Sequence, residues 1–317
     1  MKIASNRAWL MTLTLLLFAG PTLASAPLQK TQGPGYYRQM LGDFEVTVIS
    51  DGTLPFNVHQ LLTNTTPERI DAALERAFQK EPVEFSVNAY LVNTGTKLVL
   101  IDTGAGSFGP GVGQLLGNLE AAGYKPEQVD EIYITHMHGD HIGGLTRNGK
   151  ANFPNATVRA AKAEADHWLS QAKMSAASEQ ARGGFKSAMA ALEPYIAAKH
   201  FRPFDGDVEL VPGVRAVAAH GHTPGHTLYL VTSKDENLLV WGDLMHVGAV
   251  QFPDPAVTIN FDSDSPAAVR QRAHFFAEAA ARKYMVGGAH LSFPGLGHLL
   301  VNGGGYDYVP VTYSLPH

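Results

Sequence analysis

The apolar positions along the chain predict a series of strands. Residues 44–50 (FEVTVIS) alternate apolar and polar side chains as a half-buried strand does, and Asp51 with Gly52 is expected to end that strand as a turn. Residues 88–93 and 97–102 predict a hairpin, and the second segment contains the nearly continuous apolar run that is typical of buried strands. Further strands are expected at residues 131–135, 158–160, 214–218, 228–232, 238–241 and 284–286.

Helices are predicted between these strands. The first covers residues 66–80, with Thr66 as its cap, and the last covers residues 266–283, with Ser265 as its cap. The others are expected at residues 111–122, 163–172 and 186–199. Runs of strands interrupted by helices favour a mixed α/β architecture over an all-helical bundle. The sequence shows neither a repeat nor a low-complexity linker, which favours a single domain.

The first residues have the features of a signal peptide. Lys2 and Arg7 provide a positive start, residues 9–19 are nearly all apolar, and residues 24–26 (ASA) have the form of a cleavage site. The apolar run is shorter than the roughly 20 residues that span a bilayer. We therefore expect a signal peptide over residues 1–26 and an exported, periplasmic domain over residues 27–317 that is not inserted in a membrane. A buried N-terminal helix or an uncleaved anchor is the alternative.

Composition narrows the chemistry further. The formal net charge of -5 at pH 7 and the 17% of charged residues give no reason to expect nucleic acid as a partner. The chain contains no cysteine, so disulfides, thiolate catalysis and cysteine ligation of metals are excluded. Chemistry must come from histidine, carboxylates, hydroxyl groups or a metal.

The strongest chemical signal lies at residues 135–144 (THMHGDHIGG). His136 and His138 are two residues apart at the end of a predicted strand, so their rings point to the same side. Gly139 lets the chain turn and present Asp140 and His141 to the same space. Imidazole and carboxylate ligands without thiolates suit zinc, although manganese, iron and cobalt accept such sets. A polar loop with surplus histidines is the alternative.

Three later segments carry further candidate ligands. Residues 221–226 (GHTPGH) form a turn with His222 and His226 near its ends, and Asp243 and His290 each follow a predicted strand. Asp243 stands where a carboxylate could bridge two cations. Taken singly, each of these signals is weak, because a lone Asp or His at a strand end is more often a turn or cap residue than a metal ligand.

Taken together, these segments resemble the metallo-β-lactamase superfamily, from about Phe44 to the C-terminus. The resemblance implies an αββα sandwich with the site at one edge of two packed sheets. It implies two Zn²⁺ ions per chain, although other divalent metals are open. The implied ligands are His136, His138 and His226 for one metal, Asp140, His141 and His290 for the other, and Asp243 as the bridge. Asp140 and Asp243 are the expected catalytic residues.

Residues 102–106, 153–156, 222–227 and 290–295 resemble, more narrowly, the methyl parathion hydrolase family and its dizinc lactonase and arylesterase relatives. This resemblance implies that Phe108, Trp168 and Phe185 line an aromatic subsite for the leaving group. Ordinary core packing of these three rings is the alternative. A homodimer is implied on the same grounds. The match is poorest at residues 54–60, which would border the substrate.

The expected function is hydrolysis of a neutral ester by a hydroxide held between two metals. The family resemblance implies organophosphate triesters or aryl esters as substrates. Two alternatives stay open, a lactonase for aromatic or acyl-homoserine lactones and a periplasmic zinc-binding protein without catalysis. His222 is expected to support the site rather than bind metal. Asp102 is expected behind the site or in a turn, and His246, His274 and His298 on the surface or in packing.

Overall fold

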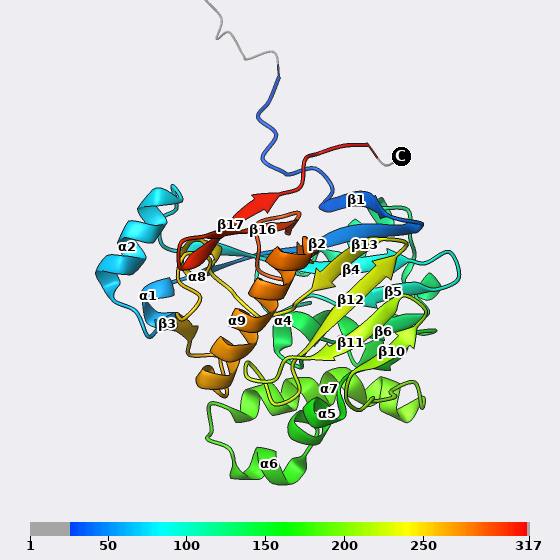
Figure 1. Cartoon of the computed structure of the whole chain (residues 1–317). Coiled ribbons are helices and arrows are strands. Elements are labelled where there is room, and N and C mark those ends of the chain that lie inside the picture. The colour runs from blue at the N-terminus through cyan, green and yellow to red at the C-terminus, as the bar shows by residue number, and fades with distance from the viewer. Residues whose placement is uncertain (1–25, 316–317) are drawn as a thin grey trace, which may run out of the picture. The chain divides into compact units, whose positions relative to one another are not determined.

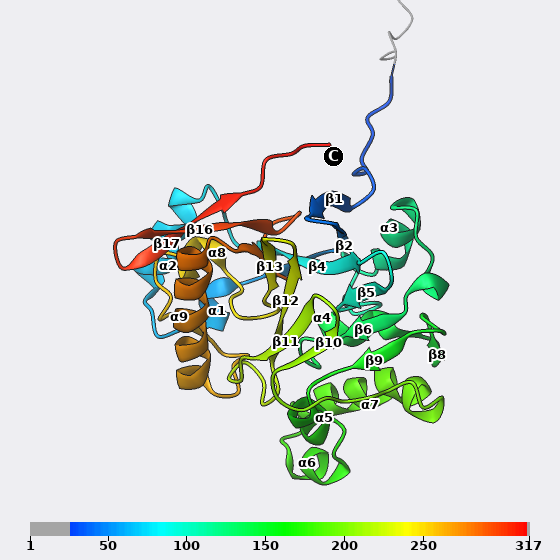
Figure 2. The same ribbon diagram turned by 45° about the vertical axis from the view of Figure 1, so that its right-hand side comes forward.

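The structure is a computed structural model that describes residues 26–315, and the residues from Pro34 onward form one compact unit. The expected signal peptide, residues 1–26, lies outside the described residues except for Ala26. Among the described helices, none has the length and apolar character needed to cross a membrane. In the unit from Pro34 onward, two β-sheets pack against each other and carry helices on their outer faces (Figures 1 and 2).

The first sheet has six strands in sequence order. They are β1 (Tyr36–Leu41), β2 (Phe44–Phe56), β4 (Val83–Asn93), β5 (Leu98–Ile101), β6 (Glu131–Tyr133) and β9 (Thr157–Arg159). The pairs from β1 to β5 are antiparallel, whereas β5, β6 and β9 are parallel. Parallel strands require crossover connections, and the segments that follow β5 and β6 therefore leave the sheet at the same edge.

The second sheet has seven strands. They are β10 (Val208–Val211), β11 (Val214–Ala218), β12 (Thr227–Ser233), β13 (Glu236–Val240), β15 (Met285–Gly287), β16 (Leu296–Asn302) and β17 (Gly305–Pro310). Only the pair β13 and β15 is parallel. Two short pairs complete the strands, β3 (Leu62–Thr63) with β14 (Thr258–Ile259) and β7 (Thr146–Arg147) with β8 (Lys150–Ala151).

Helices lie around the two sheets, and some of them cover the outer faces of the sandwich. They are α1 (Val58–Leu61), α2 (Pro67–Arg76), α3 (Leu115–Ala121), α4 (Gly139–Ile142), α5 (Lys162–Trp168), α6 (Gln171–Ala176), α7 (Arg182–Ala197), α8 (Gly248–Gln251) and α9 (Ser265–Arg282). Apolar side chains of α3 and α7 pack on the first sheet, and those of α9 pack on the second. Figure 2 shows these helices beside their sheets. Two single turns of 3₁₀-helix lie at residues 126–128 and 143–145.

A further buried apolar cluster lies between the two sheets. Val48, Tyr90 and Ile101 of the first sheet belong to one buried cluster with Tyr229 and Val240 of the second. Side chains on both faces of each sheet are therefore buried, one face against the other sheet and one against helices. This arrangement confirms the predicted αββα sandwich.

Several predicted boundaries were wrong for identifiable reasons. β2 does not end at Asp51 and Gly52 but continues to Phe56, because a bulge between Ser50 and Gly52 keeps its pairing with β4. The cap of α9 is Asp264 rather than Ser265, and its carboxylate accepts a hydrogen bond from the Ala267 backbone N–H at 2.9 Å. The helix expected at residues 163–172 is divided into α5 and α6. Strands β1, β10, β16 and β17 were not predicted.

Candidate metal centre

Two groups of ligand-capable side chains meet at the ends of strands from both sheets. The first group is His136, His138, His222 and Asp243, and the second is Asp140, His141, Asp243 and His290. Within each group the ligand atoms all lie within 4.8 Å of one another. Such a density of imidazole and carboxylate groups is typical of a metal site.

Local structure brings these residues together. The chain leaves β6 through residues 134–138, and α4 begins at Gly139 and turns Asp140 and His141 toward the site. His222 lies in the connection between β11 and β12, Asp243 follows β13 and His290 follows β15. The site therefore lies where β6, β13 and β15 end, so that rigid sheet elements hold its ligands.

Asp243 presents one carboxylate oxygen to each group. Its Oδ2 lies 3.5 Å from His136 Nε2 and 3.3 Å from His222 Nε2. Its Oδ1 lies 3.1 Å from His141 Nε2 and 3.2 Å from His290 Nε2. On the far side of the second group, Asp140 Oδ2 lies 3.4 Å from His290 Nε2. Asp243 thus occupies the position of a bridge between two neighbouring cations.

Four of these histidines use their second ring nitrogen to bind a protein oxygen. The partners are Thr135 Oγ1 for His136 at 3.1 Å, Asp102 Oδ2 for His141 at 2.8 Å, Asp262 Oδ1 for His222 at 2.9 Å and the Ser86 carbonyl for His290 at 2.9 Å. Metal-binding histidines are commonly oriented in this way by an oxygen that accepts from the other nitrogen. The rings are therefore held with Nε2 toward the centre.

The residues fit two divalent cations. His141 Nε2 and Asp243 Oδ1 are both buried, face each other at 3.1 Å, and have no hydrogen-bond partner among the described residues. Buried polar atoms without partners are costly, and a shared cation would satisfy both. The donors are only imidazole nitrogens and carboxylate oxygens, which suits zinc and also manganese, iron or cobalt.

Electrostatics keep the bridge ionised. Burial by itself would raise the pKa of Asp243, but the imidazoles of His141 and His290 hold it well below its usual range. Burial lowers the pKa of His138 to about 3, so this ring is neutral and able to bind a metal. Burial also acts to lower the pKa of His222, but the carboxylates of Asp243 and Asp262 raise it to about 9. Because a proton and a cation compete for such a nitrogen, acid should weaken metal binding.

The structure brings His222, and not His226, into the groups of candidate ligands. The Nε2 atom of His222 points to Asp243, whereas His226 belongs to neither group of candidate ligands. Both ring nitrogens of His226 are engaged by the backbone, Nδ1 with the Ala219 carbonyl at 3.1 Å and Nε2 with the Asp243 N–H at 3.1 Å. His226 is therefore placed to position Asp243, and His222 is the candidate ligand of this turn.

Other side chains at the site were not predicted to belong to it. His246 was expected on the surface or in packing; it is buried, and its Nε2 lies 3.0 Å from Asp243 Oδ2. Its spacing of three residues from Asp243 was the only signal in the sequence. Glu164 and Asp262 bind the loops behind the ligands, and no motif marked either. Asp102 accepts hydrogen bonds from the N–H and hydroxyl of Thr135, at 2.8 and 2.7 Å, and thus lies behind the site as expected.

The three predicted aromatic residues occupy different environments. Trp168 is half-buried, and its ring meets that of His138 edge to face with centroids 5.4 Å apart. Phe185 is only 4% exposed and packs behind Trp168 at 4.9 Å. Phe108 is 67% exposed and lies over Gly139. Trp168 and Phe108 can thus contact a substrate, whereas Phe185 supports Trp168.

The poorly matching segment 54–60 approaches the centre from the opposite side. Phe56, near the end of β2, packs against Phe85 at 4.8 Å between ring centroids, and Phe85 lies 5.8 Å from the ring of His290. Phe261 contacts Phe56 at 6.2 Å and His246 at 6.1 Å. A second aromatic wall therefore borders the ligands on this side.

Comparison with known sequences places this site in context. The model of the metallo-β-lactamase superfamily matches residues 82–290. The uncharacterized protein YobT of Bacillus subtilis (strain 168) is 29% identical over 162 residues, which are 51% of this chain and 63% of YobT. An N-acyl homoserine lactonase of Bacillus cereus is 26% identical over 195 residues, which are 55% of this chain and 70% of that enzyme.

Solved structures are similar over more of the chain. The hydrolase AbOPH of the β-lactamase superfamily is 35% identical with a TM-score of 0.86, over 90% of this chain and 100% of AbOPH. AidC, a dizinc quorum-quenching lactonase solved with a product, is 28% identical with a TM-score of 0.82, over 89% of this chain and 99% of AidC.

Proposed function

Because this chain belongs to the metallo-β-lactamase superfamily of metal-dependent hydrolases, we propose that it is a two-metal, zinc-dependent hydrolase that cleaves esters, either open or cyclic as in lactones. The observation that carries the proposal is the position of Asp243, which turns one carboxylate oxygen toward each of two groups of ligands. A single tetrahedral zinc ion would need only four ligands, fewer than this centre offers.

The chain supplies a rigid site for this chemistry. Two divalent cations, when bound, provide hydroxide near neutral pH and stabilise the negative charge that develops on the substrate oxygen. Asp102, Asp262 and the Ser86 carbonyl fix the rings of three ligands from behind. The sequence has no Gly-x-Ser-x-Gly segment and no cysteine, so it offers neither of these two common types of nucleophilic side chain.

Substrate class follows from the relatives and from the aromatic side chains beside the ligands. Several relatives are named N-acyl homoserine lactonases, and AidC is named a dizinc lactonase, which supports a carboxylic ester or lactone as the substrate. Trp168, edge-on to His138, would favour a flat leaving group, as in an aryl ester. Hydrolysis of an organophosphate triester is the second candidate, because the ring of Trp168 would also accept the aryl group of such a triester.

The test is a substrate panel on the zinc-loaded protein that starts at Pro27. The panel contains an aryl ester, an aromatic lactone, an acyl-homoserine lactone and a phosphotriester. We expect two zinc ions per chain by elemental analysis, turnover of an ester or lactone, loss of turnover on chelation, and recovery with zinc. Asp243→Ala should bind less zinc and lose most activity. Two bound zinc ions with no turnover of any substrate would instead indicate a zinc-binding protein without catalysis.

A further inference from the structure

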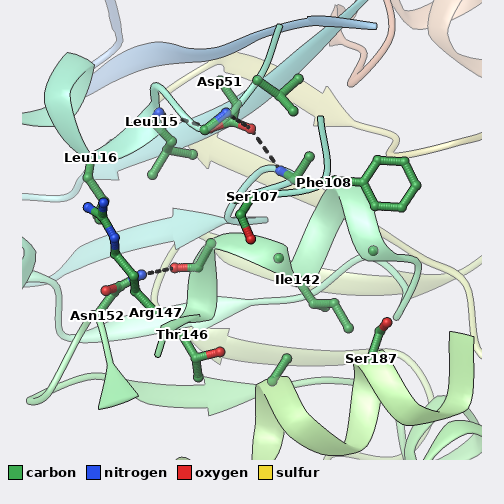
Figure 3. A pocket seen from close by; sticks show the side chains of 18 of the residues that line it. Asp51, Ser107, Phe108, Leu115, Leu116, Ile142, Thr146, Arg147, Asn152 and Ser187 are labelled. Carbon is green, nitrogen blue, oxygen red and sulfur yellow. Dashed lines mark hydrogen bonds between the residues drawn. The ribbon is translucent and has the colours of Figure 1, made fainter. Parts of the chain in front are cut away.

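A cavity lies beside the metal centre, and none of the candidate ligands lines it. Its volume is about 720 Å³, which lies in the range of small-molecule sites. Three segments form its walls, the loop at residues 105–116, the turn at residues 139–152 and one face of α7 (Figure 3). The space is therefore large enough to hold a substantial part of a substrate.

The cavity lies next to two candidate ligands along the chain. Gly139 lines it, and its neighbours His138 and Asp140 belong to the two ligand groups. A Cβ atom at Gly139 would lie 3.6 Å from the ring of Phe108, so any larger side chain there would fill the space between them. Gly139 therefore leaves open space beside the exposed ring of Phe108, next to two candidate ligands in the chain.

The walls carry both apolar and polar groups. Leu116, Ile142 and Ala190 supply apolar surface, and the hydroxyl groups of Ser107 and Ser187 point into the space from different walls (Figure 3). Neither hydroxyl group forms a hydrogen bond with another described residue. Both are therefore available to a ligand.

The charge of the lining comes from two residues. Asp51 is buried, and its oxygens accept hydrogen bonds from the N–H groups of Ala105, Gly113 and Leu115 at 2.8, 3.0 and 2.9 Å. Arg147, in contrast, is exposed and forms no ion pair with any described residue. The cavity thus has one cationic side chain whose donors are not used by the protein. A guanidinium group in this position is suited to a carboxylate or another anion.

We propose that this cavity binds the acyl portion of the substrate and selects acyl chains that end in a carboxylate, which Arg147 contacts. The proposal rests on the proposed ester hydrolysis and refines it, since the ester group itself stays neutral while the distal end of the acyl chain is anionic. Hydrolysis of such an ester releases a dicarboxylate. Phe108 would pack against the first carbons of the chain, and Ser107 and Ser187 would add hydrogen bonds.

The test of the charge uses matched pairs of nitrophenyl esters on the zinc-loaded enzyme. Monoesters of adipic, suberic and sebacic acid are compared with alkanoate esters of the same chain length. Arg147→Ala should raise KM for the carboxylate-ended esters by about threefold to tenfold, because a partly exposed charged hydrogen bond is lost, and should leave the alkanoates unchanged. Lys150→Ala, on the neighbouring β8, is the control and should change neither series. An equal change in both series for Arg147→Ala would overturn the role of its charge.

A second pair of variants tests the cavity itself. Ala190→Leu on α7 fills the lined space and should raise KM for long acyl chains more than for acetate esters. Ala197→Leu, an exposed position on the same helix outside the lining, should have no effect. If Ala190→Leu leaves the dependence on chain length unchanged, the acyl chain lies elsewhere.

Calorimetry separates failure of this inference from failure of the proposed function. If no ester is hydrolysed, the proposed function is wrong, but adipate binding to the zinc-loaded protein can still be measured. Adipate that binds more tightly than hexanoate, with an advantage lost in Arg147→Ala, supports the cavity as a carboxylate site. Equal binding of adipate and hexanoate to the unmodified protein overturns it.

Discussion

Replacing Glu164 should loosen the metal centre without removing a ligand. Glu164 is fully buried in α5, behind the ligands. Its Oε1 accepts a hydrogen bond from the Met137 N–H at 2.8 Å, between two ligand-capable histidines. Its Oε2 accepts from the Thr223 hydroxyl and the Gly225 N–H, both at 2.8 Å. One carboxylate thus joins the loop of His138 to the loop of His222.

The magnitude follows from the groups that would lose their partner. In Glu164→Ala the N–H groups of Met137 and Gly225 stay buried without an acceptor, at about 1–3 kcal/mol each, so the free energy of unfolding should fall by about 2–6 kcal/mol. Burial raises the pKa of Glu164, and removing a carboxyl that is costly to bury places the result in the lower half of this range. Zinc affinity should fall by roughly 10–100-fold, as for other groups that orient ligands.

Zinc affinity is measured by competition with a chromogenic chelator, and stability by urea unfolding of the metal-free protein. Glu164→Gln keeps one acceptor oxygen and should lie between Glu164→Ala and the unmodified protein. Asp166→Ala is the matched control, because Asp166 is an exposed carboxylate on the same helix that pairs only with Lys162. Glu164→Ala with unchanged zinc affinity would show that the two loops hold the ligands without this carboxylate.

Three further predictions concern the ligands, the pH dependence and export. His222→Ala should lower the bound zinc toward one ion per chain, whereas His226→Ala should retain two ions and lose stability; elemental analysis and thermal melting distinguish these results, and the opposite pattern would restore the ligand role of His226. The hydrogen bond to Glu81 raises the pKa of His59 above 6.5, so this pair stabilises the folded protein while His59 is protonated. Below pH 6.5, His59→Ala should lower the free energy of unfolding by less than about 1 kcal/mol. This loss should become smaller as the pH rises through the raised pKa. Urea unfolding at several pH values checks this, and a pH-independent loss would contradict it. Protein exported by a Gram-negative host should begin near Pro27 by N-terminal sequencing, and a cytoplasmic chain that begins at Met1 would refute export.

Most residues of the two candidate ligand groups could be predicted from the sequence because they follow strands in a recognisable order. Residues 131–135 predicted a strand that delivers His136 and His138, and β6 does so. Asp243 and His290 follow predicted strands as well, and both belong to the ligand groups. The apolar periodicity locates the ends of strands. Polar residues that follow a strand lie at the edge of its sheet, and here the edges of the two sheets lie together. Position along the chain was therefore enough to find these residues.

The choice between His222 and His226 could not be made from position. Both lie in one turn between β11 and β12, both are buried, and either could reach the centre. The two rings differ in what their Nε2 atoms face. The candidate ligand is the histidine whose Nδ1 has a protein partner while its Nε2 points to the centre. For His222 that partner is Asp262, which is 40 residues away in the chain. For His226 the Asp243 N–H occupies Nε2. Only the tertiary structure contains this information.

Buried carboxylates that hold loops were missed for a related physical reason. Asp51 resembled a turn residue because it precedes a glycine, yet it binds three N–H groups of the loop at residues 105–115. Glu164 lay inside a predicted helix, where a glutamate is ordinary. A carboxylate that accepts backbone N–H groups leaves no spacing pattern, because its partners contribute amides that every residue possesses. Such residues are found only from the backbone donors that they satisfy in the structure: Glu164 joins two loops that carry candidate ligands, and Asp51 holds the loop that lines the cavity.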